Sequence, residues 1–274
     1  MTWLTEFGQV IYEASRLDSA GGWLGAARDA VLAGDPERLL EAFPGGVTID
    51  DPRAGRVEGR AALEAYCETS SSWLHDRDSR TTSVATTLGR ARSVGEFDLE
   101  LTEAGRTFVL PVAVVVEPDP GHQAVRIRVY HSQWPLLGHH VLRPTLLQRD
   151  PAVHESDVVG GYQAALAAGD AAAIVATFES DGCFREPSGP QFRVCGTPAL
   201  REFFARFFSA GGGIVLEHCT VTEDGVQTAL EFNAVKWGGV DLPHQAGVAV
   251  YERGPSGRIR EARIYDDVQG PVEE

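Results

Sequence analysis

The chain contains the same pattern of residues twice. Four matches lie 135 residues apart: Leu32-Ala33-Gly34-Asp35 with Ala167-Ala168-Gly169-Asp170, Phe43 with Phe178, Asp51-Pro52 with Glu186-Pro187, and Arg128-Val129-Tyr130 with Arg263-Ile264-Tyr265. A fifth lies 137 residues apart: Gly59 and Ala62-Leu63 with Gly196 and Ala199-Leu200. Solenoid repeats are about 20–50 residues long. The longer period therefore predicts two copies of one domain.

Both copies have the same predicted order of elements. A first helix ends at a Gly-Asp pair, because glycine is favoured just after a helix. A short helix, a short strand closed by proline and a third helix follow, at 36–43, 47–51 and 60–74 in the first copy and at 171–178, 183–186 and 197–209 in the second. The second copy then has strands near 214–222, 226–237, 244–252 and 258–268. Helices followed by a strand meander predict an α+β fold with helices on one face of a curved antiparallel sheet.

The repeat also predicts the domain organisation. Residues 1–19 form an N-terminal extension whose apolar residues fit one stripe of a helix. Residues 20–134 form the first domain, 135–154 a linker stiffened by prolines, and 155–270 the second domain.

Charge and composition limit which binding partners and which cell compartment we expect. The net charge of −15, with no local cluster of Lys or Arg, argues against nucleic acid and anionic membranes as partners. We find no apolar run long enough to span a membrane and no signal-peptide pattern at the N-terminus, so we expect a cytoplasmic protein. In that compartment the four cysteines, Cys67, Cys183, Cys195 and Cys219, are expected to be free thiols.

Motifs for a bound cofactor or metal are absent from the sequence. It has no CxxC, HExxH or Walker A motif, and no GxGxxG in a meaningful position. His139 and His140 are adjacent, and neighbours on a strand point to opposite faces, so they are poorly placed to share a metal. We therefore expect neither a cofactor nor a metal.

The repeated pattern of helix, Gly-Asp, helix, Phe, strand, (Asp/Glu)-Pro, Gly-x-x-(Ala)-Leu helix and strand meander resembles the ketosteroid-isomerase-like family. That family includes the SnoaL-like polyketide cyclases and belongs to the NTF2-like superfamily. The resemblance covers residues 20–134 and 155–270. It implies two cystatin/NTF2-like cones, in each of which a curved antiparallel sheet wraps a long helix and leaves an apolar pocket.

The resemblance also implies site residues. The carboxylate before the motif proline is the family's general base, which corresponds to Glu186 in the second copy and Asp51 in the first. A tyrosine on the first helix donates to the developing oxyanion, and this position is Tyr162 in the second copy but Ala27 in the first. The family's second donor, a protonated aspartate, falls near 247–249, where this chain has no acid.

Strand alternation adds Asp266. It shares a face with Ala262, Ile264 and Val268, so an acid there would lie in apolar surroundings near Glu186 and have a raised pKa. A carboxyl group kept neutral in this way could replace the missing donor. The alternative is that Asp266 caps a solvated strand end. Asp267 should point the other way, into solvent.

The first copy has His131 at the position of Asp266, which allows an Asp51–His131 acid/base dyad. The alternative is a wall histidine bonded to a strand carbonyl. Asp76 and Asp78 could assist Asp51 in epoxide-type chemistry, or lie in an ordinary polar loop. For Trp237 the alternative is the contact between the two copies, and for Trp73 it is the same polar loop. Five further residues are candidates for the substrate pocket: Trp237, His218, Phe204, Trp73 and Ile264.

Together these observations predict a small-molecule enzyme that uses acid/base chemistry without a cofactor. The reaction would be isomerisation, cyclisation or epoxide-type ring opening of an apolar, polyketide- or steroid-like substrate, with the second copy as the better active site. The alternative is a non-catalytic binding or scaffold protein. The two copies are expected to pair as an intramolecular pseudo-dimer, and a further homodimer stays open.

Overall fold

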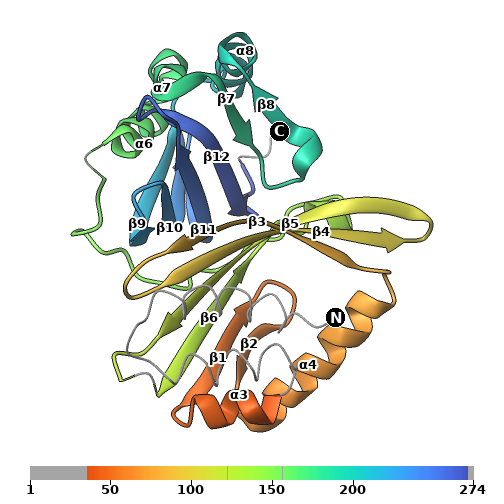
Figure 1. The fold of residues 1–274 in the computed structure, drawn as a ribbon. Helices are drawn as coiled ribbons and strands as arrows, with labels where there is room; N and C mark the ends of the chain where they lie inside the picture. The colour runs from red at the N-terminus through yellow and green to blue at the C-terminus, as the bar shows by residue number, and fades with distance from the viewer. Residues whose placement is uncertain (1–35, 122, 156, 271–274) are drawn as a thin grey trace. The chain divides into compact units, whose positions relative to one another are not determined.

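The computed structural model describes residues 36–121, 123–155 and 157–270 (Figure 1). The chain divides into two compact units, with the division between His131 and Ser132. The predicted helix within residues 1–19 and the first helix of the first copy, with Ala27, lie outside the described residues.

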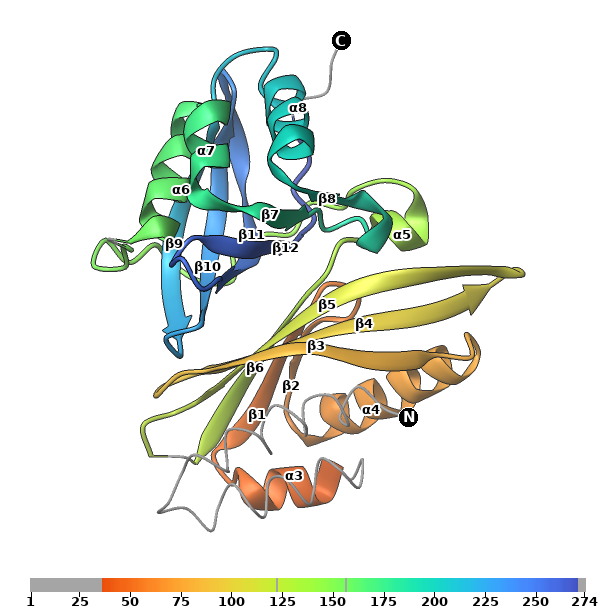
Figure 2. The same ribbon diagram turned by 45° about the horizontal axis from the view of Figure 1, so that its top comes forward.

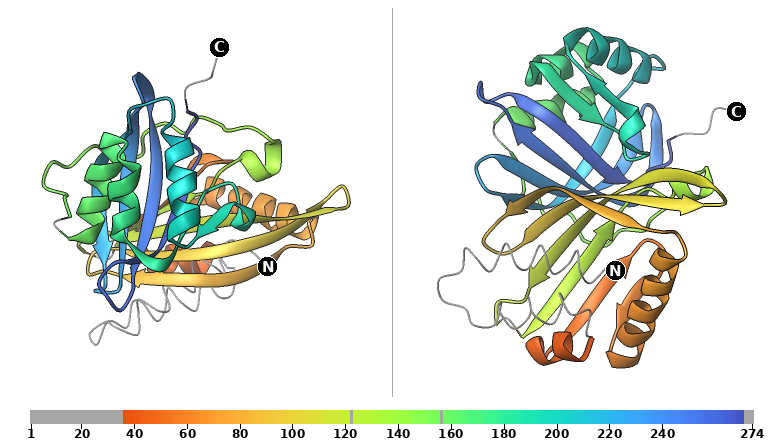
Figure 3. Two further views of the ribbon diagram at one scale, coloured as in Figure 1. Left: turned by 90° about the horizontal axis from the view of Figure 1, so that it is seen from above. Right: turned by 45° about the vertical axis from the view of Figure 1, so that its right-hand side comes forward.

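The first unit is a six-stranded sheet with two described helices. Its strands lie in the order β2-β1-β6-β5-β4-β3, and α4 lies alongside β2 (Figure 3). The elements are α3 (Pro36–Ala42), β1 (Gly46–Asp51), β2 (Gly55–Glu58), α4 (Arg60–His75), β3 (Arg80–Leu88), β4 (Ser93–Glu103), β5 (Arg106–Pro118) and β6 (Ala124–Tyr130).

The second unit is a six-stranded sheet in the order β8-β7-β12-β11-β10-β9, and α6 packs beside α7 (Figure 2). Its helices are α5 (Trp134–Leu137), α6 (Val158–Ala168), α7 (Ala171–Thr177), the 3-10 helix η1 (Pro190–Phe192) and α8 (Thr197–Phe207). Its strands are β7 (Phe178–Arg185), β8 (Arg193–Cys195), β9 (Ile214–Glu223), β10 (Gln227–Trp237), β11 (Val240–Arg253) and β12 (Ile259–Asp266).

The two sheets have the same connectivity, which confirms the predicted α+β fold in two copies. In each sheet the four-strand meander is antiparallel, as expected. One pairing in each sheet is parallel, β1 with β6 and β7 with β12. It arises because the strand before the (Asp/Glu)-Pro lies next to the last strand. Because the pairing is parallel, the C-terminal ends of the two strands lie side by side, and these ends carry the predicted site residues.

Local sequence explains how the helices of the second unit begin and end. The side chains of Asp157 and Asp170 cap α6 and α7 by accepting hydrogen bonds from Val159 N and Ala173 N. Gly169 ends α6 in the left-handed region, with φ of 68°. A Cβ at this position would lie 2.4 Å from the carbonyl oxygen of Gly212, so only glycine fits. This explains the Gly-Asp pair in the repeat.

Apolar side chains from three helices and the inner face of the sheet form one core in the second unit. On α8, Leu200, Phe203 and Phe204 are buried at helical spacing. On the sheet, alternation directs Phe232 and Tyr251 to the same side as the helices. Each buried aromatic side chain of this kind contributes roughly 1.5–3 kcal/mol through burial.

Residues 132–151, at the start of the second unit, pack against its sheet. Asn233 Nδ2 donates to the carbonyl oxygen of Leu147 over 3.0 Å, and the amide of Ala246 donates to that of Arg143 over 3.0 Å. Pro144 also forms a β-bridge with Gln245. The same segment reaches the residue after β12, because the amide of Val141 donates to Asp267. Among the described residues, no helix has the length and apolar character needed to cross a bilayer.

Two of the four cysteines are not free thiols, which corrects the expectation. Cys183 and Cys195 form a disulfide. The two residues face each other directly in the antiparallel pairing of β7 with β8, so their side chains meet. The pairing depends on strand register, and the sequence spacing of 12 residues gives no sign of it. Cys67 and Cys219 are buried free thiols.

We expect this disulfide to stabilise the second unit. A loop of this size contributes about 2–3 kcal/mol when closed by a disulfide. Replacing both Cys183 and Cys195 by serine should therefore lower the free energy of unfolding by about that amount. Thiol titration of the unfolded chain should find two reactive groups without reductant and four with it. Four without reductant would contradict the bridge.

Candidate functional site

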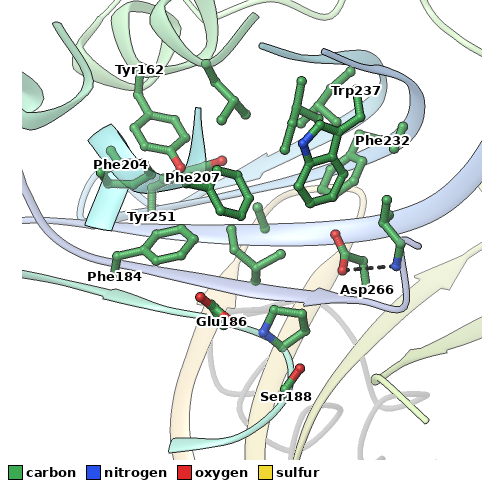
Figure 4. Close-up of a pocket in the computed structure, with 18 of the residues that line it drawn as sticks. Tyr162, Phe184, Glu186, Ser188, Phe204, Phe207, Phe232, Trp237, Tyr251 and Asp266 are labelled. Carbon is green, nitrogen blue, oxygen red and sulfur yellow. Dashed lines mark hydrogen bonds between the residues drawn. The ribbon is translucent and has the colours of Figure 1, made fainter. Parts of the chain in front are cut away.

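The second unit contains an apolar pocket of about 140 Å³ between its helices and the inner face of its sheet. Most of the lining is aliphatic or aromatic: Tyr162, Leu166, Phe184, Pro187, Phe204, Phe207, Ile214, Leu216, Phe232, Ala234, Trp237, Ala249, Tyr251, Ile264 and Val268. The other lining residues are His140, Glu186, Ser188 and Asp266. Figure 4 shows Tyr162 and Glu186 projecting from opposite sides toward the same space. A few polar groups in an apolar cavity are typical of a small-molecule site.

Tyr162 supplies a hydroxyl group inside the pocket. It lies on α6, is 1% exposed, and packs its ring against Phe178 and Tyr251. Among the described residues none makes a hydrogen bond to its hydroxyl. Burial raises the pKa of Tyr162 above its ordinary value, so the group keeps its proton. Its hydroxyl is therefore available to donate to a ligand.

Glu186 follows the last residue of β7 and precedes Pro187, which ends the strand. Within the described ranges, its carboxyl group has neither an ion pair nor a hydrogen bond. Burial raises the pKa of Glu186, although the charges of Arg206 and His140 partly oppose the effect. A carboxylate with a raised pKa is a stronger base than an ordinary one.

Asp266 is the last residue of β12 and lies opposite Gly247 of β11. A Cβ at position 247 would lie 2.7 Å from that of Asp266, so the glycine provides the space for the aspartate. Its carboxyl group accepts one long hydrogen bond, 3.3 Å from the amide of Val268. Burial raises the pKa of Asp266 to about 6. The predicted sharing of a face with Ile264 and Val268 agrees with the pocket lining.

Asp267 is buried, so the expectation that it lies in solvent is wrong. Its carboxylate accepts hydrogen bonds from Ser132 Oγ at 2.6 Å and from the amide of Val141 at 2.7 Å. The same carboxylate lies 2.8 Å from Nδ1 of His140. The segment after β6 folds over this strand end and removes Asp267 from water. Alternation along β12 could not reveal this, because the covering residues lie outside the meander.

His140 lines the pocket and was missed as a site residue. In the sequence, His140 is marked only by its neighbour His139, and that adjacency argues against a shared metal. His140 has no counterpart in the repeat that would have marked it. Its ring is placed by Asp267 and by the ring of Trp134, whose centroid lies 5.1 Å away. Within the described ranges, no cluster of three or more His, Cys, Asp or Glu residues is suited to a metal ion.

The predicted pocket walls fall into two groups. Phe204, Trp237 and Ile264 line the pocket. His218 does not line it; its Nε2 lies 3.4 Å from Gln163 Oε1, and Gln163 Nε2 donates to the Tyr251 hydroxyl over 2.6 Å. Burial lowers the pKa of His218, which favours the neutral ring.

Trp73, the remaining predicted wall residue, is absent from the described lining of the first unit's cavity. Its ring instead lies against two guanidinium groups, those of Arg53 at 3.7 Å and Arg77 at 4.3 Å. Cation–π contacts of this kind fix the ring on the surface of α4.

Asp51 has a different environment from its counterpart Glu186. Its carboxylate accepts hydrogen bonds from the Tyr66 hydroxyl at 3.0 Å and from the amides of Arg53 and Ala54 at 2.7 and 2.9 Å. It borders a separate cavity of about 390 Å³ in the first unit. The described lining of that cavity does not include His131, so the structure does not bring the proposed dyad together there. Asp76 and Asp78 are exposed.

Comparison with known protein families finds a similarity, and it lies within the second copy. Residues 159–262 match the sequence model of the SnoaL-like domain. This agrees with the resemblance seen in the repeat pattern. No curated protein is similar enough in sequence to count as a match.

Several solved structures are similar to part of the chain. One, described as the epoxide hydrolase/cyclase-like enzyme SalBIII in pyran ring formation in polyether salinomycin, is 23% identical over 40% of this chain and 87% of its own, with a TM-score of 0.34. An NTF2-like protein of unknown function from Cytophaga hutchinsonii is 16% identical over 43% and 95%, with a TM-score of 0.33. A cystatin fold protein from Novosphingobium aromaticivorans is 17% identical over 39% and 93%, with a TM-score of 0.33.

The raised pKa of Asp266 has a consequence for stability. Its pKa in the folded chain, about 6, exceeds the ordinary 3.8, so the stability it contributes is present below pH 4 and is lost as the pH rises through 6. Asp266→Asn removes this loss. We expect the variant to gain about 1–2 kcal/mol relative to the parent between pH 4 and pH 8, allowing for partial exposure of the side chain.

Denaturant unfolding at the two pH values measures this difference. Asp267→Asn is the contrasting variant, because it disturbs a carboxylate that is bonded to Ser132 and Val141. It should destabilise the chain at pH 8. If Asp266→Asn also destabilises more at pH 8 than at pH 4, the carboxyl group is not buried at an unfavourable site.

Proposed function

We propose that the second unit binds a small, mostly apolar molecule bearing an oxygen function and carries out acid/base chemistry on it without a cofactor. One observation carries the proposal. Two carboxyl groups, Glu186 and Asp266, lie in an apolar pocket with the Tyr162 hydroxyl, and no described residue forms an ion pair with either carboxyl. Such groups cost stability, and clusters of perturbed titratable groups in a cavity are typical of reactive sites.

Glu186 is the proposed general base. It would remove a proton from a carbon beside a carbonyl group, or from an attacking hydroxyl group. The Tyr162 hydroxyl and the protonated carboxyl of Asp266 would donate hydrogen bonds to the oxygen on which negative charge develops. The apolar lining strengthens these interactions, because it lowers the local dielectric constant.

The same groups also suit ring closure or ring opening. A protonated Asp266 could deliver its proton to the departing oxygen of an epoxide while the Glu186 carboxylate activates the attacking hydroxyl. The reaction class is therefore isomerisation, cyclisation or epoxide-type ring opening, and the apolar lining suits a polyketide- or steroid-like substrate. The alternative is a non-catalytic protein that binds the same kind of molecule.

Glu186→Gln tests the proposed base. Loss of a general base typically lowers the rate by about 10²–10⁴-fold. We expect a loss of that size in kcat on a substrate found by screening apolar ketones and epoxides, with binding retained because the two side chains have nearly the same shape. Glu202→Gln, on the exposed face of α8, is the matched control and should keep full activity. Full activity of Glu186→Gln would refute the proposed role, and binding without turnover by the parent would favour the alternative.

Tyr162→Phe tests the proposed hydrogen-bond donor. Removal of one oxyanion donor costs up to about 10²–10³-fold in kcat. Stability should change little, because the described residues make no hydrogen bond to this hydroxyl and the ring is kept. Asp51→Asn in the first unit should give the opposite result, a loss of stability with little change in turnover. A large loss of turnover in Asp51→Asn would place the chemistry in the first unit.

The pH dependence of kcat/KM follows from the two carboxyl groups. Activity should rise as Glu186 loses its proton, at a pH above that of an ordinary glutamate, and fall as Asp266 loses its proton near pH 6. In Asp266→Asn the fall near pH 6 should disappear. A profile of unchanged shape in that variant would show that Asp266 is not the donor.

A further inference from the structure

We propose that His140, oriented by Asp267, is a further proton donor to the ligand oxygen in the pocket of the second unit, in addition to Tyr162 and Asp266. This inference rests on the proposed function, since it needs Glu186 as the base. It adds a residue from outside the SnoaL-like match, which begins at residue 159.

The backbone brings His140 to the pocket from α5. Gly138 ends this short helix in the left-handed region, with φ of 74°, and the chain then turns back toward β12. His140 follows two residues later and lines the pocket with Glu186 and Asp266. The ring of Trp134, at the start of α5, packs against the imidazole, with the ring centroids 5.1 Å apart. The imidazole is thus held between a helix and the end of a strand.

Asp267 determines which nitrogen faces the ligand. Its Oδ1 lies 2.8 Å from Nδ1 of His140, and Nδ1–H donates to this carboxylate. Hydrogen bonds from Ser132 Oγ and the amide of Val141 hold the carboxylate in place. Nε2 has no hydrogen-bond partner among the described residues, so it is left for the pocket. A carboxylate that orients an imidazole in this way favours its cationic form.

The charges around His140 favour the same form. The hydrogen bond to Asp267 raises the pKa of His140, and the carboxyl groups of Asp266 and Glu186 raise it further, while burial opposes them. Asp266 loses its proton near pH 6. His140, with a pKa above the ordinary 6.5, holds its proton to higher pH. Asp266 and His140 therefore lose their protons at different pH values.

The protons balance for an isomerisation. Glu186 takes a proton from carbon, the C–H pair forms a C=C bond, and the carbonyl π pair moves to oxygen, which takes the Nε2 proton of His140. In a β,γ-unsaturated ketone, Glu186 then returns its proton to the γ carbon, where the β,γ π pair forms the new C–H bond while the enol π pair moves to the α,β position. The enol O–H proton returns to Nε2 as the carbonyl re-forms. No atom or electron is gained or lost by the protein.

4-Nitrophenol is a suitable probe, because it is an apolar ring with one oxygen whose ionisation is visible by absorbance. A hydrogen bond from a cationic donor is worth about 1.5–3 kcal/mol, so His140→Gln should reduce the ionisation constant of the bound probe by roughly 10–100-fold. Asp267→Asn should act in the same direction. His139→Gln, at the exposed neighbour, is the matched control and should leave the constant unchanged.

NMR titration of the imidazole tests the positioning role of Asp267 without a ligand. The pKa of His140 should lie above the ordinary value and should fall in Asp267→Asn. If that variant does not fold, Ser132→Ala, which removes one of the hydrogen bonds to Asp267, should give a smaller fall. An unchanged pKa of His140 in the folded variants, or failure of 4-nitrophenol to bind the parent, would overturn the inference.

Turnover separates this inference from the proposed function. If Glu186→Gln is inactive while His140→Gln keeps both full turnover and the probe's ionisation constant, His140 is not a donor and the proposed function stands. If Glu186→Gln is fully active, the proposed function fails and the inference fails with it. Losses in both variants, with His139→Gln unaffected, support both.

Discussion

Taking a carboxyl group out of water costs free energy unless hydrogen bonds or a counter-charge replace its hydration. Four carboxyl groups near the ends of the paired strands fall into two groups according to their hydrogen bonds. Asp51 and Asp267 are each held by several hydrogen bonds from nearby groups. Glu186 and Asp266 lie in an apolar pocket with almost none. The first pair stabilises the fold, whereas the second pair is left with few partners at the expense of stability, and the proposed function depends on that contrast.

The two units have the same strand connectivity, but different side chains line their interiors. Where α8 presents Phe203 and Phe207, the equivalent face of α4 presents Tyr66 and Ser70, and Tyr66 bonds to Asp51. The aromatic face of α8 offers no hydrogen bond to Glu186, whereas the Tyr66 hydroxyl on α4 donates one to Asp51. The same position before the motif proline therefore supports a proposed base in one unit and a bonded carboxylate in the other. The two units share one connectivity, and a few helix positions set the surroundings of the acid before the motif proline.

Sequence reasoning succeeded where the information is local or repeated. The offset matches predicted the shared connectivity, and strand alternation predicted that Asp266 shares a face with Ile264. It failed where contacts depend on tertiary structure. The Cys183–Cys195 disulfide requires the register of β7 and β8, and the burial of Asp267 requires the segment that carries His140. That segment lies outside the repeat, so no second copy could draw attention to it.

Titration of the carboxyl groups by carbon NMR tests the central claim most directly, because it needs neither a substrate nor a variant that changes activity. The account predicts that Asp266 titrates near pH 6 and that Glu186 titrates above the ordinary value for a glutamate. An apolar ligand that fills the pocket should raise both pKa values further, since it removes the remaining water. Ordinary values for both groups, unchanged by such a ligand, would contradict the claim that this pocket holds a pair of reactive acids.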